Sequence, residues 1–245
     1  AWSVEAEGAV GILTDEGPWG TSDTRPVLVG AGVYFPITRA YRVGLYGGFA
    51  GGERSLALAD PVTNVTVLDG SLASDNQQRV ESVVTVDQVG VVVLSGFRLR
   101  QGEVGGNGRG AGLQATNAEL TITGCRFEEH QAYRGAGASL TQSTVLVEGT
   151  DFVDNVANHG GGGLYINGGD VTVERCRFLG NSATSYGGGL FVENTPARVS
   201  RSWFEGNLSG LGGGIRLALA DGTVQNSVFW QNEADGNGGG GISLY

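Results

Sequence analysis

Lysine and methionine are absent from this chain, and histidine, cysteine and proline are scarce. All 15 basic residues are arginine, 25 residues are acidic, and the net charge is -10. Nucleic-acid binding requires a basic surface that neutralises phosphates, so this charge argues against a nucleic-acid partner. No apolar run approaches the roughly 20 residues of a membrane-spanning helix. We therefore expect neither a nucleic-acid partner nor a membrane span.

The scarcity of histidine and cysteine limits the cofactors that the chain can hold. Its only histidines are His130 and His159, which excludes a histidine-rich metal site. The two cysteines, Cys125 and Cys176, are too few to define a cellular compartment. We expect no cofactor.

Glycine is abundant, with 45 residues in 245. There is no Gly-x-y period and there are 5 prolines, which excludes a collagen triple helix. Apolar residues make up 40% of the chain, which argues against a disordered protein. The glycines therefore need another explanation, and internal repetition is the first to test.

A repeat of about 25 residues accounts for them. Five phenylalanines follow one another at intervals of 25, 26, 26 and 25 residues. An asparagine lies three positions after each phenylalanine except the first, where His130 stands, and a glycine cluster follows. The three columns are Phe127, Phe152, Phe178, Phe204 and Phe229; Asn155, Asn181, Asn207 and Asn232; and, as last glycine of each cluster, Gly137, Gly163, Gly189, Gly214 and Gly241.

The pattern inside each repeat is that of strands. Segments such as "LTITGCRF", "VLVEGTDF" and "VTVERCRF" alternate apolar and polar residues with a period of two. Short strands in a strict repeat of this length predict an all-β fold, a single parallel β-helix of about 25-residue coils. Chain length divided by the period predicts nine or ten coils.

The three columns acquire physical roles in such a solenoid, because residues one repeat apart stack about 4.8 Å apart. The phenylalanines are expected to form an interior aromatic stack. The asparagines are expected to form a hydrogen-bonded ladder at a turn, with His130 replacing asparagine in its first rung. The glycines are expected where positive φ or close backbone approach excludes a Cβ atom.

The domain organisation follows from where the repeat is regular. We expect a β-helix over residues 25–245, with irregular coils over 25–100, an inserted loop over 101–109 and regular repeats over 110–245. Residues 1–24 are predicted to form an N-terminal cap or an irregular segment. A new strand begins just before Tyr245, so we expect the open last coil to pair with another copy or another surface protein.

Polar residues that lie one repeat apart provide a further test of the predicted stacking of the coils. Arg126, Asp151 and Arg177 alternate in charge on successive coils, so we expect them to pair across strands. Glu148 stacks on Glu174, and Arg175 on Arg201, so we expect these columns to point to solvent. Cys125 and Cys176 are two coils apart, beyond disulfide reach, and are expected to be buried free thiols.

At these residues the chain resembles a known family. The pairing of F-x-x-N with G-G-[AG]-[IL], as in "FVDN…GGGL" and "FWQN…GGGI", resembles the repeats of polymorphic outer-membrane proteins. The stretch "AYRVGLYGGFAGGERSLALADP…NVTVLDG" resembles the N-terminal coils of large right-handed parallel β-helix proteins of Gram-negative bacteria. The resemblance covers residues 25–245 and implies a right-handed helix, export, a cell-surface or extracellular location and adhesion. The first repeat departs from it, with "FEEH" and "GAGA".

Parallel β-helices also include polysaccharide lyases and hydrolases, so an enzyme is the alternative. Hydrolases of this kind need paired carboxylates, and lyases need a cluster of acidic residues with a basic residue. The nearest candidates are Glu148 with Glu174, and Glu128, Glu129 and Asp154 around the asparagine turn. His159 with Asp154 and a serine is a weaker candidate for a catalytic triad. We interpret these residues as a solvated acidic face and favour a non-catalytic chain.

Two features suit binding. The loop over 101–109 extends from a rigid scaffold, where functional loops are often found. Trp203, Trp230, Tyr133 and Tyr186 are aromatic residues that could stack on sugars. We therefore predict a non-catalytic, exported scaffold, an adhesin-like passenger or stacking subunit; the alternative is a polysaccharide-binding or polysaccharide-cleaving protein.

Overall fold

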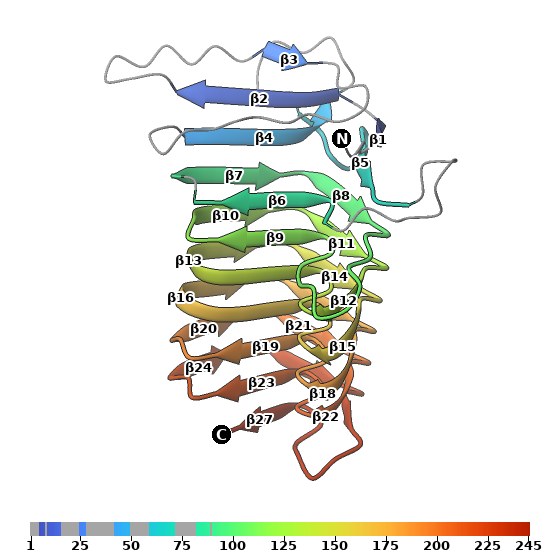
Figure 1. The fold of residues 1–245 in the computed structure, drawn as a ribbon, viewed down its shortest axis with the longest axis vertical. Helices are drawn as coiled ribbons and strands as arrows, with labels where there is room; N and C mark the ends of the chain where they lie inside the picture. Colours follow the sequence, from blue (N-terminus) through green and yellow to red (C-terminus); the bar gives the residue numbers. More distant parts are fainter. Residues whose placement is uncertain are drawn as a thin grey trace.

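The chain folds into a parallel β-solenoid, shown by a computed structural model in Figure 1. The structure describes residues 5–7, 9–15, 25–27, 42–49, 59–71, 82–88 and 90–245. These residues form only strands, bridges, turns and bends, so they contain no helix with the length and apolarity of a membrane span. Much of the predicted segments 1–24 and 25–100 lies outside the described residues.

Three sheets run along the solenoid, and each coil contributes strands to them. The first sheet, sheet A, has eight strands in the order β1-β5-β8-β11-β14-β17-β21-β25. Their bounds are β1 Glu5–Glu7, β5 Thr66–Asp69, β8 Phe97–Arg100, β11 Arg126–Glu128, β14 Asp151–Val153, β17 Arg177–Leu179, β21 Trp203–Glu205 and β25 Val228–Trp230. Apart from β1, these strands pair in parallel with their neighbours.

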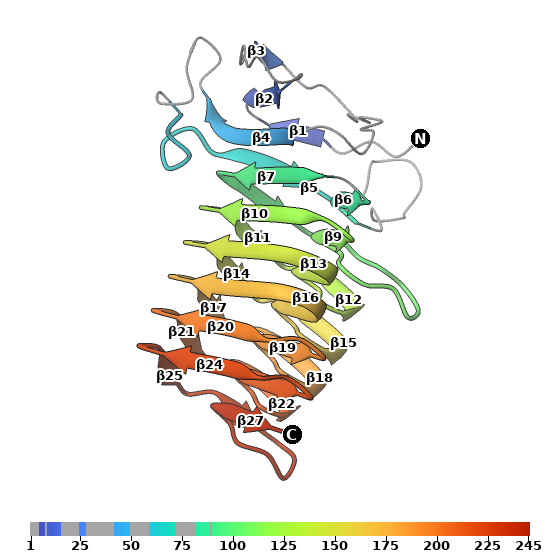
Figure 2. The same ribbon diagram turned by 90° about the vertical axis from the view of Figure 1, so that its left-hand side faces the viewer.

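The second sheet, sheet B, has two halves that are continuous through the 11-residue strands β13 and β16. Its first half contains β6 Val84–Asp87, β9 Leu113–Thr116, β13 Ala138–Glu148, β16 Leu164–Glu174, β19 Leu190–Glu193, β23 Ile215–Ala218 and β27 Ile242–Leu244. Its second half adds β2 Ala9–Asp15, β3 Arg25–Val27, β4 Arg42–Phe49, β7 Val91–Ser95, β10 Glu119–Thr123, β20 Ala197–Ser200 and β24 Gly222–Gln225. Figure 2 shows β10, β13, β16, β20 and β24 as successive rungs.

The third sheet, sheet C, has five parallel strands in the order β12-β15-β18-β22-β26. Their bounds are β12 Gln131–Arg134, β15 Val156–Gly160, β18 Ser182–Tyr186, β22 Leu208–Leu211 and β26 Glu233–Ala234. In Figure 1 this column of strands stands beside the first half of sheet B.

The described solenoid has about six turns of roughly 26 residues, so the expectation of nine or ten coils is wrong. Dividing length by period assumed that every residue belongs to a parallel coil. At the N-terminal end, β1 and β2 instead pair antiparallel with β5 and β4. The insertion over 101–109 also lengthens one coil without adding a turn.

The predicted columns form the interior. The five phenylalanine rings stack with centroids 4.6 to 5.1 Å apart and planes within 8° of parallel. The side-chain amide of Asn155 donates to Asn181 Oδ1 at 2.9 Å, and Asn181 donates likewise to Asn207 at 3.0 Å. Each amide also donates to a phenylalanine carbonyl of the preceding coil. Cys125 and Cys176 are buried and free, as predicted, and burial raises the pKa of each thiol to about 12.

Different glycines of a cluster fulfil the two expected roles, positive φ and close backbone approach. The glycine two positions before the last one of a cluster has positive φ, as at Gly161 (66°) and Gly187 (55°). The last glycine has ordinary φ but no room for a side chain, since a Cβ on Gly163 or Gly189 would lie 2.7 Å from a carbonyl oxygen of the next coil. Together they make the sharp bend that joins sheet C to sheet B.

Candidate functional site

The glycine bend sets the outward side chains of sheet C against those of the first half of sheet B. Along β16, Leu164 and Ile166 belong to the interior core, whereas Tyr165 between them points the other way. Tyr165 is nonetheless completely buried, because side chains of sheet C cover it from outside. We call this region the aromatic–arginine corner. It consists of Arg109, Tyr133, Arg134, His159, Tyr165, Tyr186, Phe191, Glu193 and Arg216.

Two columns of rings meet in the corner. On sheet C, His159 lies between Tyr133 and Tyr186, with ring centroids 5.0 and 5.2 Å away. On sheet B, Tyr165 lies 5.4 Å from Phe191 of the next coil. The columns touch where Tyr186 and Phe191 approach to 5.3 Å. The rings therefore form a continuous aromatic cluster, in which the sheet B rings are buried and the row from Tyr133 to Tyr186 on sheet C is partly exposed.

A polar network organises one end of the corner. The guanidinium of Arg134 donates to the Tyr165 hydroxyl at 2.8 Å and to Glu193 Oε2 at 3.3 Å. The Tyr165 hydroxyl donates to the same carboxylate oxygen at 2.7 Å, and the Asn167 amide donates to both groups. Burial raises the pKa of Tyr165, so its phenol stays protonated at neutral pH. The network fixes Arg134 against the ring of Tyr165.

The insertion over residues 101–109 contributes Arg109 to the same end of the corner. It stays attached to the solenoid through bridges from Glu103 to Gln131 and from Arg109 to Arg134. The Arg109 guanidinium lies 5.6 Å from the centroid of the Tyr165 ring, at cation–π distance. The predicted binding loop and two of the predicted aromatic residues, Tyr133 and Tyr186, are therefore parts of one site.

Arg216 occupies the other end of the corner. It is only 7% exposed, and its guanidinium lies 5.8 Å from the Tyr186 ring and 5.3 Å from the Tyr245 ring. It donates to the hydroxyl of Ser243, and no carboxylate of the described residues lies within ion-pair distance. This is a buried cation without an opposite charge.

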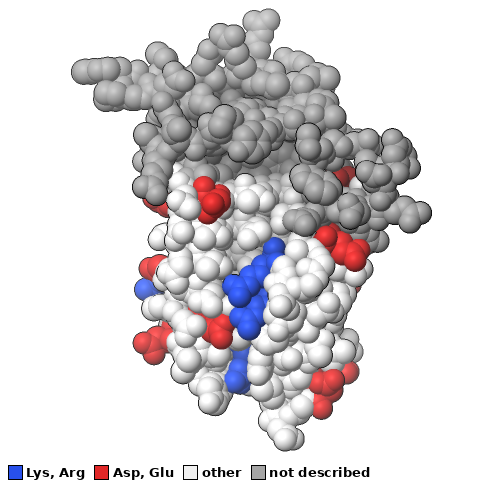
Figure 3. All heavy atoms as spheres, in the orientation of Figure 1, with Lys and Arg blue, Asp and Glu red and all other residues white. Residues whose placement is uncertain are grey.

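Three buried side-chain nitrogens of the corner have no hydrogen-bond partner in the structure. They are Arg134 Nε, His159 Nδ1 and Arg216 Nε. Burial lowers the pKa of His159, the charges of Arg134 and Arg109 lower it further, and Glu193 opposes them. With His159 neutral, three arginines face one carboxylate. Figure 3 shows most of the basic side chains visible on this face in one column along the axis.

Three of the acidic residues singled out from the sequence, Glu128, Glu148 and Glu174, form structural ion pairs. Glu148 and Glu174 are register partners, as predicted, and Arg175 pairs with both. Arg201 adds a second contact to Glu174 at 2.8 Å. The arginine column therefore interleaves with the glutamate column and offsets its like-charge repulsion.

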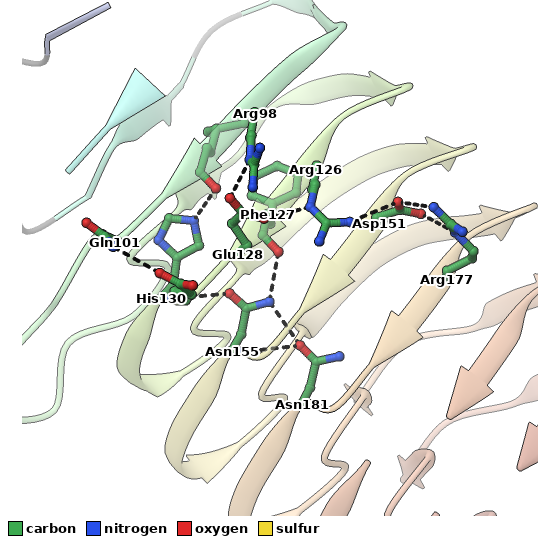
Figure 4. Close-up of polar contacts among 12 residues, drawn as sticks. Arg98, Gln101, Arg126, Phe127, Glu128, His130, Asp151, Asn155, Arg177 and Asn181 are labelled. Carbon is green, nitrogen blue, oxygen red and sulfur yellow. Dashed lines mark hydrogen bonds and ion pairs between the residues drawn. The ribbon is translucent and has the colours of Figure 1, made fainter. Parts of the chain in front are cut away.

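The outward column of sheet A is likewise neutralised, as Figure 4 shows. Arg126 and Arg177 both pair with Asp151, which confirms the predicted alternation. Glu128 is buried and pairs with Arg98 and Arg126. Burial raises the pKa of Glu128, but the hydrogen bonds from the two arginines outweigh it and hold the pKa below its usual value.

His130 has the structural role predicted for it. Its backbone N–H donates to Asn155 Oδ1 at 3.1 Å, as the asparagines do in later coils. Its Nδ1 accepts from the Gly102 N–H at 2.9 Å, and its Nε2 lies 3.1 Å from the Leu99 carbonyl (Figure 4). Burial lowers the pKa of His130 to about 4, so the ring is neutral.

The weaker candidates do not assemble into sites. His159 packs between tyrosines, and no contact in the described structure joins it to Asp154 or a serine. The described residues hold no group of three histidine, cysteine, aspartate or glutamate side chains that could bind a metal ion. Trp203 and Trp230 face outward on sheet A, 39% and 55% exposed.

The sheet B side of the corner was not predicted from the sequence, although the repeat contains its signal. Two positions after the last glycine of successive clusters stand Ser139, Tyr165, Phe191, Arg216 and Ser243. Register pairs these residues on successive coils. An outward column of large aromatic and basic residues beside a tight bend was the available clue.

Comparison with known proteins agrees with the fold. The family model for the right handed beta helix region matches residues 74–229, which is more than half of the chain. Searches of curated proteins and of solved structures gave no match. With the parallel coils, the stacked interior and this match, the chain belongs to the right-handed beta helix region family.

Proposed function

We propose that the chain is a non-catalytic scaffold that binds an elongated polysaccharide along the aromatic–arginine corner. The observation that supports this role most strongly is the continuous row of rings from Tyr133 to Tyr186, flanked by hydrogen-bond donors and parallel to the axis. Aromatic faces suit the apolar faces of sugar rings, and guanidinium groups donate to their oxygens. Export and a surface location, implied by the resemblance to polymorphic outer-membrane proteins, stay predictions.

Binding is favoured over cleavage by the state of the polar groups. Proton transfer needs an acid or base within reach of the ligand. The Tyr165 hydroxyl is buried and already bonded to Arg134, Asn167 and Glu193. Glu148 and Glu174 are held in ion pairs with arginine. If the chain cleaves a polysaccharide and both Glu148→Gln and Glu174→Gln abolish this cleavage, the chain is an enzyme and the non-catalytic role is wrong.

The binding role is tested with an immobilised panel of neutral and acidic polysaccharides. We expect Tyr133→Ala and Tyr186→Ala each to weaken binding roughly two- to tenfold, because an aromatic contact contributes about 0.5–1.5 kcal/mol. Trp230→Ala is the matched control, since it removes an exposed ring from sheet A. Binding that depends on Trp230 alone would move the site to sheet A, and failure to bind any polysaccharide would refute the role.

A further inference from the structure

Building on the proposed polysaccharide role, we propose that the ligand is acidic. Its sulfate or carboxylate groups would contact Arg216 at one end of the corner and Arg109 with Arg134 at the other. The alternative is a neutral polysaccharide that is held by the aromatic rings alone. The charges of the corner decide between the acidic and the neutral ligand.

The arginines of the chain divide into two groups by their partners. Residues 90–245 contain ten arginines, and eight of them form an ion pair with a carboxylate. Within that range the two without such a pair are Arg109 and Arg216, and both lie in the corner. On a chain of net charge -10, the positive charge of residues 90–245 that has no carboxylate partner is concentrated at one place.

Arg216 makes the strongest case for an anion. Burying a charge without a counter-ion costs several kcal/mol. Cation–π contacts with Tyr186 and Tyr245 and the bond to Ser243 offset part of this cost. Its Nε–H still has no acceptor. An anionic group of a ligand would supply both the opposite charge and the acceptor.

The other end of the corner also carries excess positive charge, although a carboxylate already neutralises part of it. Glu193 neutralises one positive charge at Arg134, and Arg109 adds a second over the same Tyr165 ring. Arg134 Nε has no acceptor either. Glu193 thus shows that this end accommodates a carboxylate, and one positive charge remains for a ligand.

Register gives the separation of the two ends. Tyr165, Phe191 and Arg216 are partners on three successive coils. Two steps of about 4.8 Å place Arg216 about 10 Å along the axis from Tyr165. A polymer that carries anionic groups at intervals and lies along the axis would reach both ends, with a sugar ring over Tyr186, which is partly exposed.

The test uses dextran, carboxymethyl-dextran and dextran sulfate, which share one backbone, together with polygalacturonate. Binding of the purified chain is measured at low and moderate salt. We expect the acidic polymers to bind at least tenfold more tightly than dextran. Arg216→Gln should weaken acidic binding roughly tenfold to hundredfold, since a charged hydrogen bond contributes about 1.5–3 kcal/mol. Arg198→Gln is the control, because it removes the same charge from an exposed arginine paired with Asp170.

A second measurement separates this inference from the role on which it rests. Inorganic sulfate is titrated while the Nε–Hε resonance of Arg216 is followed by NMR. A shift without binding of any polysaccharide would support the anion subsite and refute the polysaccharide role. Equal binding of dextran and its acidic forms, unaffected by Arg216→Gln, would refute the anion subsite and leave the role standing.

Two details keep the outcome decisive. If Arg216→Gln does not fold, Arg109→Gln tests the other end, since Arg109 belongs to the insertion and forms no ion pair within residues 90–245. Preference for dextran sulfate identifies sulfate as the recognised group, and preference for the two carboxylated polymers identifies carboxylate. Equal loss of acidic binding in Arg216→Gln and Arg198→Gln would refute a specific subsite.

Discussion

The hydroxyl of Tyr165 on β16 donates to Oε2 of Glu193 on β19 at a distance of 2.7 Å. The same oxygen accepts hydrogen bonds from Arg134 and Asn167. Glu193 is therefore the internal anion of the aromatic–arginine corner, one coil beyond the tyrosine that it holds. It stabilises the polar network and also reduces the positive charge available to a ligand.

Replacing Glu193 by glutamine separates these two effects. Glu193→Gln should strengthen binding of dextran sulfate about three- to tenfold, because it removes the carboxylate that competes for Arg134. Stability should fall by about 1 kcal/mol, because charge-assisted hydrogen bonds become neutral ones. Affinity is measured by calorimetry and stability by urea denaturation. Glu148→Gln is the control for charge alone, and a weakening by Glu193→Gln would show that the carboxylate itself contacts the ligand.

The sequence predicted the interior far better than the corner, and the reason is physical. Stacking of identical coils forces Phe152 onto Phe178 and Asn155 onto Asn181, so a repeat in the sequence specifies the contact directly. The polar contacts of Tyr165 have no such constraint. Its partners Arg134 and Glu193 come from other positions of other coils, and they meet it only because the bend at Gly161 folds two outward faces together. Periodicity cannot reveal contacts between different columns.

His130 should make the protein acid-sensitive. Burial holds its folded pKa at about 4, below the ordinary 6.5, so the folded state disfavours the protonated ring. The stability from neutral His130 is complete above pH 6.5 and is lost as pH falls towards 4, because the unfolded chain binds the proton first. The loss amounts to roughly 3 kcal/mol.

His130→Asn should remove that part of the pH dependence. Asparagine at this position restores the residue type of the later rungs, where each amide bonds the next coil. Urea denaturation of both proteins at pH 7, 5 and 4 provides the comparison. The stability difference between them should change with pH in favour of the variant. A constant difference would mean that His130 titrates normally in the folded state.

Two glycine substitutions separate steric exclusion from backbone conformation. A Cβ on Gly189 would lie 2.7 Å from the carbonyl oxygen of Gly214, although φ is ordinary there. Gly206 has φ of 62° and open space around its Cβ position. We expect Gly189→Ala to cost about 1–3 kcal/mol or more through overpacking, and Gly206→Ala about 1 kcal/mol through strain. Thermal denaturation ranks the two variants, and the reverse order would show that coil spacing relaxes around an added methyl group.

The two thiols should be unreactive while the solenoid is folded. Burial raises the pKa of Cys125 and Cys176 to about 12, so the thiolate is scarce at pH 8, and the sulfurs lie in the interior. A thiol reagent should therefore label neither residue in buffer and both in strong denaturant. Labelling of one cysteine at intermediate denaturant would show that its coil opens before the rest.

The pKa of His159 reports the excess positive charge of the corner without any ligand. Burial lowers this pKa first, and the charges of Arg134 and then Arg109 lower it further. Removing one of those charges should raise it, so Arg109→Gln should shift the NMR titration of the His159 ring to higher pH. Arg198→Gln should leave that titration unchanged, because Arg198 is exposed on β20 and paired with Asp170. Binding of dextran sulfate should act in the same direction as Arg109→Gln, since it adds negative charge beside the same ring. An unchanged titration in Arg109→Gln would mean that Arg109 does not act on the corner, and the insertion would then lose its place in the site.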